Sequence, residues 1–228
     1  MIKEKENESS YYIETNPYRG LFVCLEGIDA AGKTTQMKRL KTFFESRKVN
    51  FIMTHEHNEK FLLGKEIQEI LEEKDHNKKP SSLEFQKMYV ANRKDHLEKL
   101  IIPSLEEGKL VITDRYFWST IAYGSLGVDK DALIELNKNF IAPDLTILLN
   151  VDPKECLKRK DLSREKKEFF ERLEKQEKIS QTYQWLKSNF KNNIFVLSGN
   201  GKENAISNEI IDIVTRHPKF YNSERIKS

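Results

Sequence analysis

The segment VCLEGIDAAGKTTQMKRL (residues 23–40) decides the fold, because a loop with two glycines joins an apolar run to an amphipathic stretch. Within it, residues 27–34 fit the pattern G-x-x-x-x-G-K-[ST]. In this pattern the backbone N–H groups of the loop surround a phosphate, and the dipole of the following helix points at the same anion. The segment therefore predicts a strand, a phosphate-binding loop and a helix in succession.

Two glycines, a lysine and a threonine supply the chemistry of this loop. Gly27 and Gly32 permit backbone conformations that a Cβ would obstruct. Lys33 brings a positive charge to the β- and γ-phosphates of a nucleotide, and the Thr34 hydroxyl is a ligand for Mg²⁺. The residues predicted to bind the nucleotide phosphates are Gly27, Ile28, Asp29, Ala30, Ala31, Gly32, Lys33, Thr34 and Thr35.

Around the loop, β-rich apolar runs alternate with helical stretches along the chain. Near-continuous apolar runs are typical of strands that are covered on both faces. The alternation indicates an α/β protein with a three-layer, doubly wound, parallel five-stranded sheet, in which ligands bind beyond the carboxyl ends of the strands. The expected strands are 21–25, 49–53, 109–113, 144–151 and 193–197, and the expected helices are about 33–47, 63–74, 82–107, 129–139, 153–160, 166–189 and 202–215.

The length of 228 residues suits one domain with short appendages. Residues 1–20 are polar apart from a short aromatic step, and residues 216–228 are also polar. We therefore expect a flexible N-terminal extension and a polar C-terminal tail on either side of a domain over residues 21–215.

The composition excludes several classes of protein. Lys and Arg number 39 against 36 Asp and Glu, so nothing suggests a general nucleic-acid binder. No apolar run reaches membrane-spanning length, and the N-terminus lacks the apolar core of a signal peptide. Cys24 and Cys156 lie in apolar surroundings without metal-ligand spacing, which indicates reduced thiols and a cytoplasmic protein.

The kind of phosphate-binding protein follows from other motifs. The chain lacks the N-K-x-D element with which GTPases read guanine, and it lacks the apolar run ending in Asp-Glu that is usual in ATPase motors. The stretch FQKMYVANRKDHLEKL (residues 85–100) is helical in period and places Tyr89 and Arg93 on one face. A ring and a guanidinium at this spacing suit the stacking and hydrogen bonding of a base, but an amphipathic helix with Arg93 in solvent explains them equally well.

A second stretch favours a kinase for a small molecule. LVITDRYFWSTIAYG (residues 110–124) places Asp114 and Arg115 just beyond a buried strand. Arg115 is suited to bind an acceptor phosphate in a bidentate manner, and Asp114 to hold a metal-bound water beside Thr34. A salt bridge among neighbouring side chains is the alternative for this pair.

Together, the segments EGIDAAGKTTQ, MYVANRKDH, DRYFWSTIAYG and APDLTILLNVDP resemble the thymidylate (dTMP) kinase family in order and spacing, from about Leu21 to Val214. The resemblance implies the fold of P-loop nucleoside monophosphate kinases, the use of ATP and Mg²⁺, and transfer of the γ-phosphoryl group of ATP to dTMP in dTTP biosynthesis. It also implies a homodimer formed by packed helices, to which the helix over 82–107 is expected to contribute.

The resemblance also implies roles for individual residues of the acceptor site. Tyr89 is similar to the family's thymine-stacking aromatic residue, and Arg93 to its base-contacting arginine. Asp29 resembles the carboxylate that reaches the 3′-hydroxyl of the acceptor sugar, and Arg115 the phosphate-binding arginine. The remaining residues that match the acceptor site are Tyr123, which crowds the 2′ position, Ser119 and Thr120, which line the base pocket, and Glu171.

A basic lid is expected over about 159–172, within the charged stretch 155–186. In the resembled family a basic residue of the phosphate loop or of the lid contacts the moving phosphoryl group. The variable positions of this phosphate loop carry no Arg or Lys, so the lid must supply the cation. Arg164 is the first choice, and the alternatives are Lys160, Lys166 and Lys167.

The chain departs from the family pattern after the second strand, where THEH replaces an Arg and a Pro with His55 and His57. We expect a protonated His55, or else Lys60 or Lys65, to substitute in part for that arginine at the acceptor phosphate. Gly124, and Tyr89 in place of the family's usual phenylalanine, are milder departures. These differences leave open a kinase for another acceptor, such as dUMP, dGMP or a deoxynucleoside, and a nucleotide-binding regulator without catalysis.

Overall fold

The computed structural model describes residues 11–73, 79–160 and 166–224. Its five-stranded sheet has the order β2-β3-β1-β4-β5, and every neighbouring pair of strands is parallel. This confirms the expected doubly wound α/β fold, and each strand starts within two residues of its expected range. The strands are β1 (Phe22–Glu26), β2 (Phe51–His55), β3 (Leu110–Asp114), β4 (Leu145–Asn150) and β5 (Ile194–Ser198).

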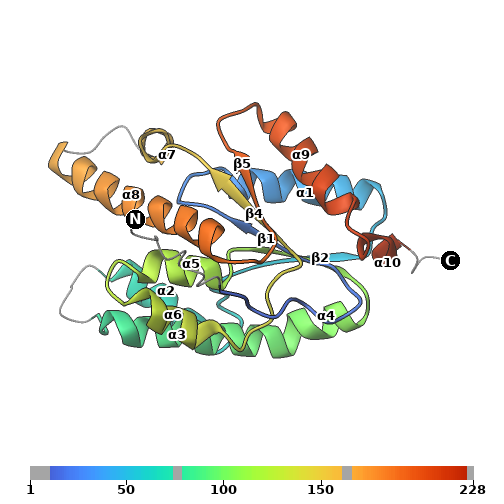
Figure 1. Cartoon of the computed structure of the whole chain (residues 1–228), viewed down its shortest axis with the longest axis horizontal. Coiled ribbons are helices and arrows are strands. Elements are labelled where there is room, and N and C mark those ends of the chain that lie inside the picture. The colour runs from blue at the N-terminus through green and yellow to red at the C-terminus, as the bar shows by residue number, and fades with distance from the viewer. Residues whose placement is uncertain (1–10, 74–78, 161–165, 225–228) are drawn as a thin grey trace, which may run out of the picture.

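Helices cover both faces of the sheet (Figure 1). On one face α1 and α9 pack against each other, and on the other face α5 contacts α3, α6 and α8. The helices are α1 (Lys33–Ser46), α2 (Gly64–Glu72), α3 (Ser82–His96), the π-helix η2 (Leu97–Ile101), α4 (Ile102–Glu106), α5 (Phe117–Gly124), α6 (Lys130–Asn137), α7 (Pro153–Lys160), α8 (Lys166–Asn189), α9 (Glu203–Thr215) and α10 (Phe220–Glu224).

The single helix expected over 82–107 is divided into α3, η2 and α4. Pro103 explains the division, because it has no N–H to donate and its ring clashes with the carbonyl four residues earlier. The chain avoids that clash by widening into a π-helical turn over Leu97–Ile101, just before the proline.

Helix α5 lies where the sequence pattern predicts no helix. Its residues, FWSTIAYG, include several aromatic and β-branched side chains, which are weak helix formers. The tertiary structure stabilises it instead. Glu26 at the end of β1 accepts hydrogen bonds from the backbone N–H groups of Tyr116 (2.9 Å) and Ser119 (3.2 Å), and so places a carboxylate at the N-terminus of the helix.

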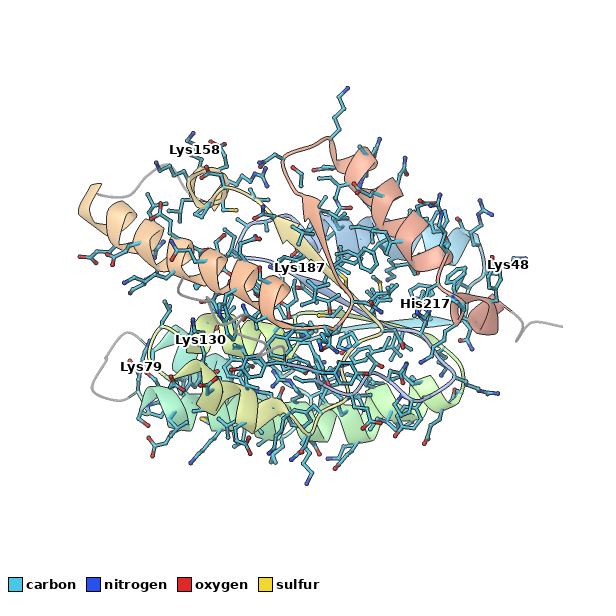
Figure 2. All side chains as sticks on the ribbon, viewed as in Figure 1. Lys48, Lys79, Lys130, Lys158, Lys187 and His217 are labelled. Atoms are coloured by element: carbon cyan, nitrogen blue, oxygen red, sulfur yellow. The ribbon has the colours of Figure 1, made fainter. Side chains whose placement is uncertain are left out.

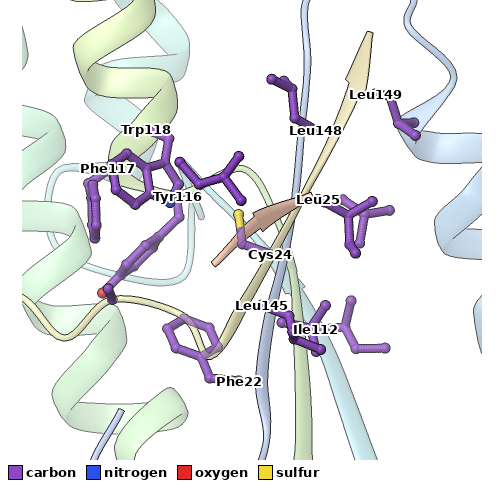
Figure 3. Packing of buried hydrophobic residues seen from close by; sticks show 14 of the residues in the cluster. Phe22, Cys24, Leu25, Ile112, Tyr116, Phe117, Trp118, Leu145, Leu148 and Leu149 are labelled. Carbon is purple, nitrogen blue, oxygen red and sulfur yellow. The ribbon is translucent and has the colours of Figure 1, made fainter. Parts of the chain in front are cut away.

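The hydrophobic core lies on both faces of β1 (Figure 3). Phe22 and Cys24 project toward the aromatic residues at the start of α5, whereas Leu25 projects to the opposite face. The rings of Phe22 and Tyr116 meet edge to face with their centroids 5.2 Å apart. The alternation of side chains along the strand thus joins the two helical layers through the sheet.

Many charged side chains lie on the outer surface. Lys48, Lys79 and Lys158 lie at the periphery of the molecule (Figure 2). Across the described part of the chain, no helix combines the length and the apolar character that crossing a membrane requires.

Residues 11–20 pack on the domain, which corrects the expectation of a flexible extension for this part of the chain. The Tyr11 N–H donates to the carbonyl of Asn189 (2.8 Å), and the Ala142 N–H donates to the carbonyl of Glu14 (2.7 Å). Ile13 is 2% exposed and belongs to the core. Composition alone did not indicate this contact, because main-chain hydrogen bonds and a short aromatic and apolar step within a polar segment make it. Residues 1–10 lie outside the described part.

The expected polar tail also packs on the domain as far as it is described. After Pro218 the chain forms the short helix α10, in which Phe220 is buried with its ring centroid 6.0 Å from that of Phe44. The preceding Lys219 reaches into the domain and contacts Asp144.

Asp144 joins the two ends of the chain to the sheet. Its buried carboxylate accepts hydrogen bonds from the backbone N–H of Phe22 (2.8 Å), from the side-chain amide of Asn16 (2.7 Å) and from the Lys219 ammonium (2.8 Å). One carboxylate thereby holds strand β1, the N-terminal segment and the C-terminal segment together.

We expect Asp144→Ala to lower the free energy of unfolding by about 3 kcal/mol, because it leaves three donors without their acceptor, one of them charged. Urea unfolding followed by circular dichroism measures this change. Asp212→Ala is the matched control. Within the described residues that carboxylate pairs only with Arg216 at the surface, so its loss should change nothing measurable. Equal stability of Asp144→Ala and the wild type would show that the ends of the chain are held by other contacts.

Candidate active site

Two cavities lie at the carboxyl ends of the strands, on either side of the phosphate-binding loop. The first, of about 570 Å³, lies between the loop, the start of α1 and the segment after β5, and we call it the P-loop cavity. The second, of about 540 Å³, lies between the loop, α3 and α5, and we call it the α3–α5 cavity. Both are large enough to hold a small molecule.

The backbone of the loop has the conformation that the glycines allow. Gly27 has a φ of 144°, and a Cβ at this position would lie 2.8 Å from the carbonyl oxygen of Leu149. The predicted residues 30–35 line the P-loop cavity. Asp29 lines the α3–α5 cavity instead, and Ile28 is buried. The loop therefore contributes to both cavities.

Lys33 curls back over the loop. Its ammonium donates hydrogen bonds to the carbonyls of Gly27 (3.0 Å) and Ile28 (3.1 Å), and the side chain is buried. Burial, together with the positive charge of Arg115, lowers the pKa of Lys33 to about 8. Nearby carboxylates, Asp114 first among them, act in the opposite direction.

The far wall of the P-loop cavity comes from parts of the chain that the motif analysis did not assign to the phosphate site. The Arg159 guanidinium, at the end of α7, donates to the carbonyls of Ala30 (3.4 Å) and Gly199 (3.3 Å). Gly199 and Gly201 follow β5 and line the same cavity. A Cβ on Gly199 would lie 2.3 Å from the Val151 side chain, so only glycine lets this segment approach the loop.

The two residues expected to hold Mg²⁺, Thr34 and Asp114, have surroundings that suit this ion. Thr34 lines the P-loop cavity with an exposed side chain. At the end of β3, Asp114 has a buried Oδ1 that makes no hydrogen bond to any described residue, although buried carboxylate oxygens are normally paired. The described residues contain no group of three or more metal-binding side chains. Such a sparse donor set suits Mg²⁺, which is usually held by one or two carboxylates, water and substrate phosphates.

Arg115 lies where the loop meets the α3–α5 cavity. Its backbone is left-handed, with a φ of 68°, and its side chain lines the cavity. The guanidinium donates to the Gly27 carbonyl (3.0 Å), the Asp29 carboxylate (2.7 Å), the Tyr123 hydroxyl (2.9 Å) and the Ser119 hydroxyl (2.9 Å). A cation is thus held beside the phosphate-binding loop and still faces a cavity.

Glu26 supports this arrangement and was not found by the motif analysis. Its carboxylate accepts hydrogen bonds from the hydroxyls of Ser119 (2.6 Å) and Tyr183 (2.7 Å), besides the backbone of α5. The Ser119 hydroxyl therefore links the Glu26 carboxylate to the Arg115 guanidinium, from which it accepts a hydrogen bond. A charged residue within an apolar strand that leads into the loop was the available signal in the sequence.

Most predicted acceptor residues do meet in the α3–α5 cavity. Tyr89 faces it from α3, and its ring meets those of Phe85 and His57 edge to face, with centroids 5.2 and 5.7 Å away. The predicted acceptor residues that line this cavity are Asp29, Tyr89, Arg93, Arg115, Ser119, Thr120 and Tyr123.

Arg93 is neither solvated nor freely available to a ligand. It is 1% exposed, and its Nε and Nη2 donate to one oxygen of Glu56 at 2.8 and 2.6 Å. Nη1 donates to Asn137 (2.5 Å), and Nη2 also donates to Thr120 (2.8 Å). The alternative of an exposed Arg93 is wrong. The guanidinium lines the cavity mainly as a group that orients its neighbours.

Glu56 is the partner that the sequence did not reveal. Burial raises the pKa of its carboxyl group to about 7, and the adjacent Arg93 opposes that rise. The Oε1 atom makes no hydrogen bond to a described residue, and Glu56 lines the cavity.

The structure places three predicted residues elsewhere. His55, expected at the acceptor phosphate, is exposed and lines neither cavity, whereas Glu56 and His57 face the α3–α5 cavity. Consecutive side chains at the end of a strand point in opposite directions, which separates His55 from Glu56. His57 follows after β2 has ended, so the alternation of the strand does not apply to it. Glu171 is exposed on α8 and lines neither cavity. Arg164 lies outside the described residues, as do the side chains of the alternatives Lys160, Lys166 and Lys167.

Known proteins match this chain over most of its length. The sequence profile of the family described as “Thymidylate kinase” matches residues 25–210. A probable thymidylate kinase of Pyrococcus horikoshii is 42% identical over 168 residues, which cover 72% of this chain and 82% of the relative. A probable thymidylate kinase of Thermococcus onnurineus is 34% identical and covers 85% and 97%, respectively. A thymidylate kinase of Prochlorococcus marinus is 31% identical and covers 83% and 97%.

The lowered pKa of Lys33 predicts a pH dependence of nucleotide binding. The ammonium attracts phosphate only while protonated, so the affinity of the free protein for ATP should fall by about tenfold between pH 7 and 9. Isothermal titration calorimetry across this range measures the change. Lys33→Ala is the control, and it should bind weakly with a flat profile. A flat profile in the wild type would contradict the expectation.

Proposed function

The chain belongs to the thymidylate kinase family, and we propose that its P-loop cavity binds ATP while its α3–α5 cavity binds dTMP. The protein is an ATP-dependent nucleoside monophosphate kinase that transfers the γ-phosphoryl group of ATP to dTMP and forms ADP and dTDP. One observation carries the assignment of the cavities. Arg115 faces the α3–α5 cavity and also bonds to Gly27 of the phosphate-binding loop, so a phosphate at Arg115 would lie next to the triphosphate.

On the ATP side, the loop amides and Lys33 bind the phosphates. We assign the nucleoside part to the space between Arg159 and the segment with Gly199 and Gly201, which completes the P-loop cavity. Thr34 would hold Mg²⁺ directly and Asp114 through water, and the bound ion would neutralise phosphate charge during transfer.

On the acceptor side, we propose that the thymine ring stacks on Tyr89 and that Asp29 binds the sugar 3′-hydroxyl. Tyr123 packs its ring under the Arg115 guanidinium (4.8 Å) and donates its hydroxyl to Asp29 (3.0 Å), so it narrows the space around the sugar. Arg115 binds the acceptor phosphate. In the free protein Asp29 holds that guanidinium in place, and the phosphate takes over part of its hydrogen bonding.

The transfer itself requires positioning and charge neutralisation and no covalent step on the protein. Arg115 orients the attacking phosphate oxygen of the acceptor, while Lys33 stabilises the charge that develops on the transferred group. Arg164 remains our proposed lid cation at the moving phosphoryl group. Closure of the lid would exclude water and so limit hydrolysis of ATP.

Two further features belong to this proposal. We propose that the protein is a homodimer to which the helical segment of residues 82–107 contributes. We also propose that the protein is cytoplasmic. The thiols of Cys24 and Cys156, which are buried and form no disulfide with each other, support this proposal.

The acceptor assignment is tested by measuring ADP release from ATP and Mg²⁺ with dTMP, dUMP, dGMP, dCMP, dAMP and thymidine. We expect selective turnover of dTMP. Preference for dGMP or thymidine would keep the phosphate chemistry and overturn the acceptor. Binding of ATP without turnover of any acceptor would favour a nucleotide-binding regulator.

Arg115→Ala should lower turnover by about a hundredfold or more, because it removes the cation that positions the attacking phosphate. The affinity for ATP, measured by calorimetry, should change little. Arg216→Ala removes an exposed arginine whose only ion-pair partner among the described residues is Asp212, and it serves as the control, for which we expect wild-type turnover. Turnover of Arg115→Ala close to that of the wild type would refute the assigned role.

A further inference from the structure

One amide that opens into the α3–α5 cavity has no part in the mechanism above. Gln86 is 8% exposed and lines the cavity, and its side chain makes no hydrogen bond to any residue that the structure describes. Buried polar side chains in proteins nearly always have a partner. The amide therefore offers one acceptor and two donor hydrogens to whatever fills the cavity.

The position of Gln86 is set by two helices that face each other. Gln86, Tyr89 and Arg93 follow one another along a single face of α3, at spacings of three and four residues. Thr120 and Gly124 lie four residues apart on α5. The facing sides of α3 and α5 form one wall of the cavity. Arg93 contacts Thr120 at one end of this wall, and Gln86 lies beside Gly124 at the other end, about one helical turn further along α5.

Gly124 makes room for the amide. A Cβ at position 124 would lie 3.1 Å from the Gln86 Cδ atom and 2.9 Å from a methyl carbon of Leu133. A larger residue here would therefore displace the Gln86 side chain. The glycine noted as a departure from the family pattern is the feature that admits Gln86 to the cavity.

At the end of the wall where Arg93 meets Thr120, the group that faces the cavity is a hydrogen-bond donor. Arg93 can only donate, and it donates to the Thr120 hydroxyl oxygen at 2.8 Å. The Thr120 hydroxyl must then direct its own hydrogen elsewhere, and it finds no acceptor among the described residues. Because Thr120 lines the cavity, its free hydrogen is available to a ligand carbonyl.

We propose that Gln86 is a specificity-determining residue that reads the hydrogen-bonding edge of the acceptor base, an inference that rests on the binding of dTMP proposed above. With the ring stacked on Tyr89, the Thr120 hydroxyl donates to the 4-keto oxygen. The Gln86 carbonyl accepts the ring N3–H, and its NH₂ group donates to the 2-keto oxygen. The wall thus matches the acceptor, donor, acceptor order of this edge.

The same wall rejects cytosine. A cytosine ring presents an amino group to the donor hydroxyl of Thr120 and an unprotonated N3 to the Gln86 carbonyl. Rotation of the amide by 180° satisfies N3 but then sets the Gln86 carbonyl against the 2-keto oxygen. The geometry selects a 4-keto pyrimidine and does not depend on the 5-methyl group, so thymine and uracil are read alike by these residues.

The test compares dTMP with N3-methyl-dTMP, which lacks the N3 hydrogen, in the wild type and in Gln86→Leu. For the wild type, we expect kcat/KM to be about tenfold to a hundredfold lower with the methylated acceptor. Gln86→Leu should lose a similar factor with dTMP and little with N3-methyl-dTMP, so that the preference between the two acceptors nearly disappears. Discrimination against dCMP should weaken in parallel.

Controls separate this role from a structural one. The affinity for ATP and the thermal midpoint should be unchanged in Gln86→Leu, and Gln86→Met provides a second variant of similar shape. Gln181→Leu, which replaces an exposed glutamine of α8, should keep the wild-type preference. Equal losses with both acceptors in Gln86→Leu and Gln86→Met, or an unchanged preference, would overturn the proposal. Failure of the wild type to phosphorylate dTMP would instead overturn the proposed function.

Discussion

The buried carboxylate of Glu26 connects the phosphate-binding loop to helices α5 and α8. It follows the core of β1 and directly precedes Gly27, and it accepts hydrogen bonds from the N-terminus of α5 and from the hydroxyls of Ser119 and Tyr183. Burying a carboxylate without such donors would cost several kcal/mol. The loop, α5 and α8 are therefore held in one arrangement, which sets the positions of Arg115 and Ser119 on the acceptor side.

This arrangement prepares the site before any ligand binds. Ser119 accepts a hydrogen bond from Arg115 and donates one to Glu26, so the guanidinium is oriented through a hydroxyl and remains free to face the cavity. Asp29 holds the same guanidinium from the loop. A charge fixed in a partly desolvated cavity needs little reorganisation when phosphate arrives, which is the main way in which proteins stabilise phosphoryl transfer.

A second set of buried polar contacts fixes the side chains that line the acceptor cavity. Arg93 is bonded to Glu56, Asn137 and Thr120, so it positions donors and acceptors around the cavity more than it contacts a ligand itself. His55, which stands where the family pattern has an arginine, is exposed and does not line this cavity. Specificity therefore resides on the facing sides of α3 and α5, where Gln86 lies.

The sequence by itself determined the strands, the phosphate-binding loop and the residues that follow each strand, because these depend on local patterns of apolar residues and glycine. Lys33, Asp114 and Arg115 could be placed in this way. Only the tertiary structure decided that α5 is a helix, that Ile13 belongs to the core, and which side chains face the cavity. Those outcomes depend on partners far apart in the chain, such as Glu26 with α5, and on directions of side chains that a one-residue shift reverses.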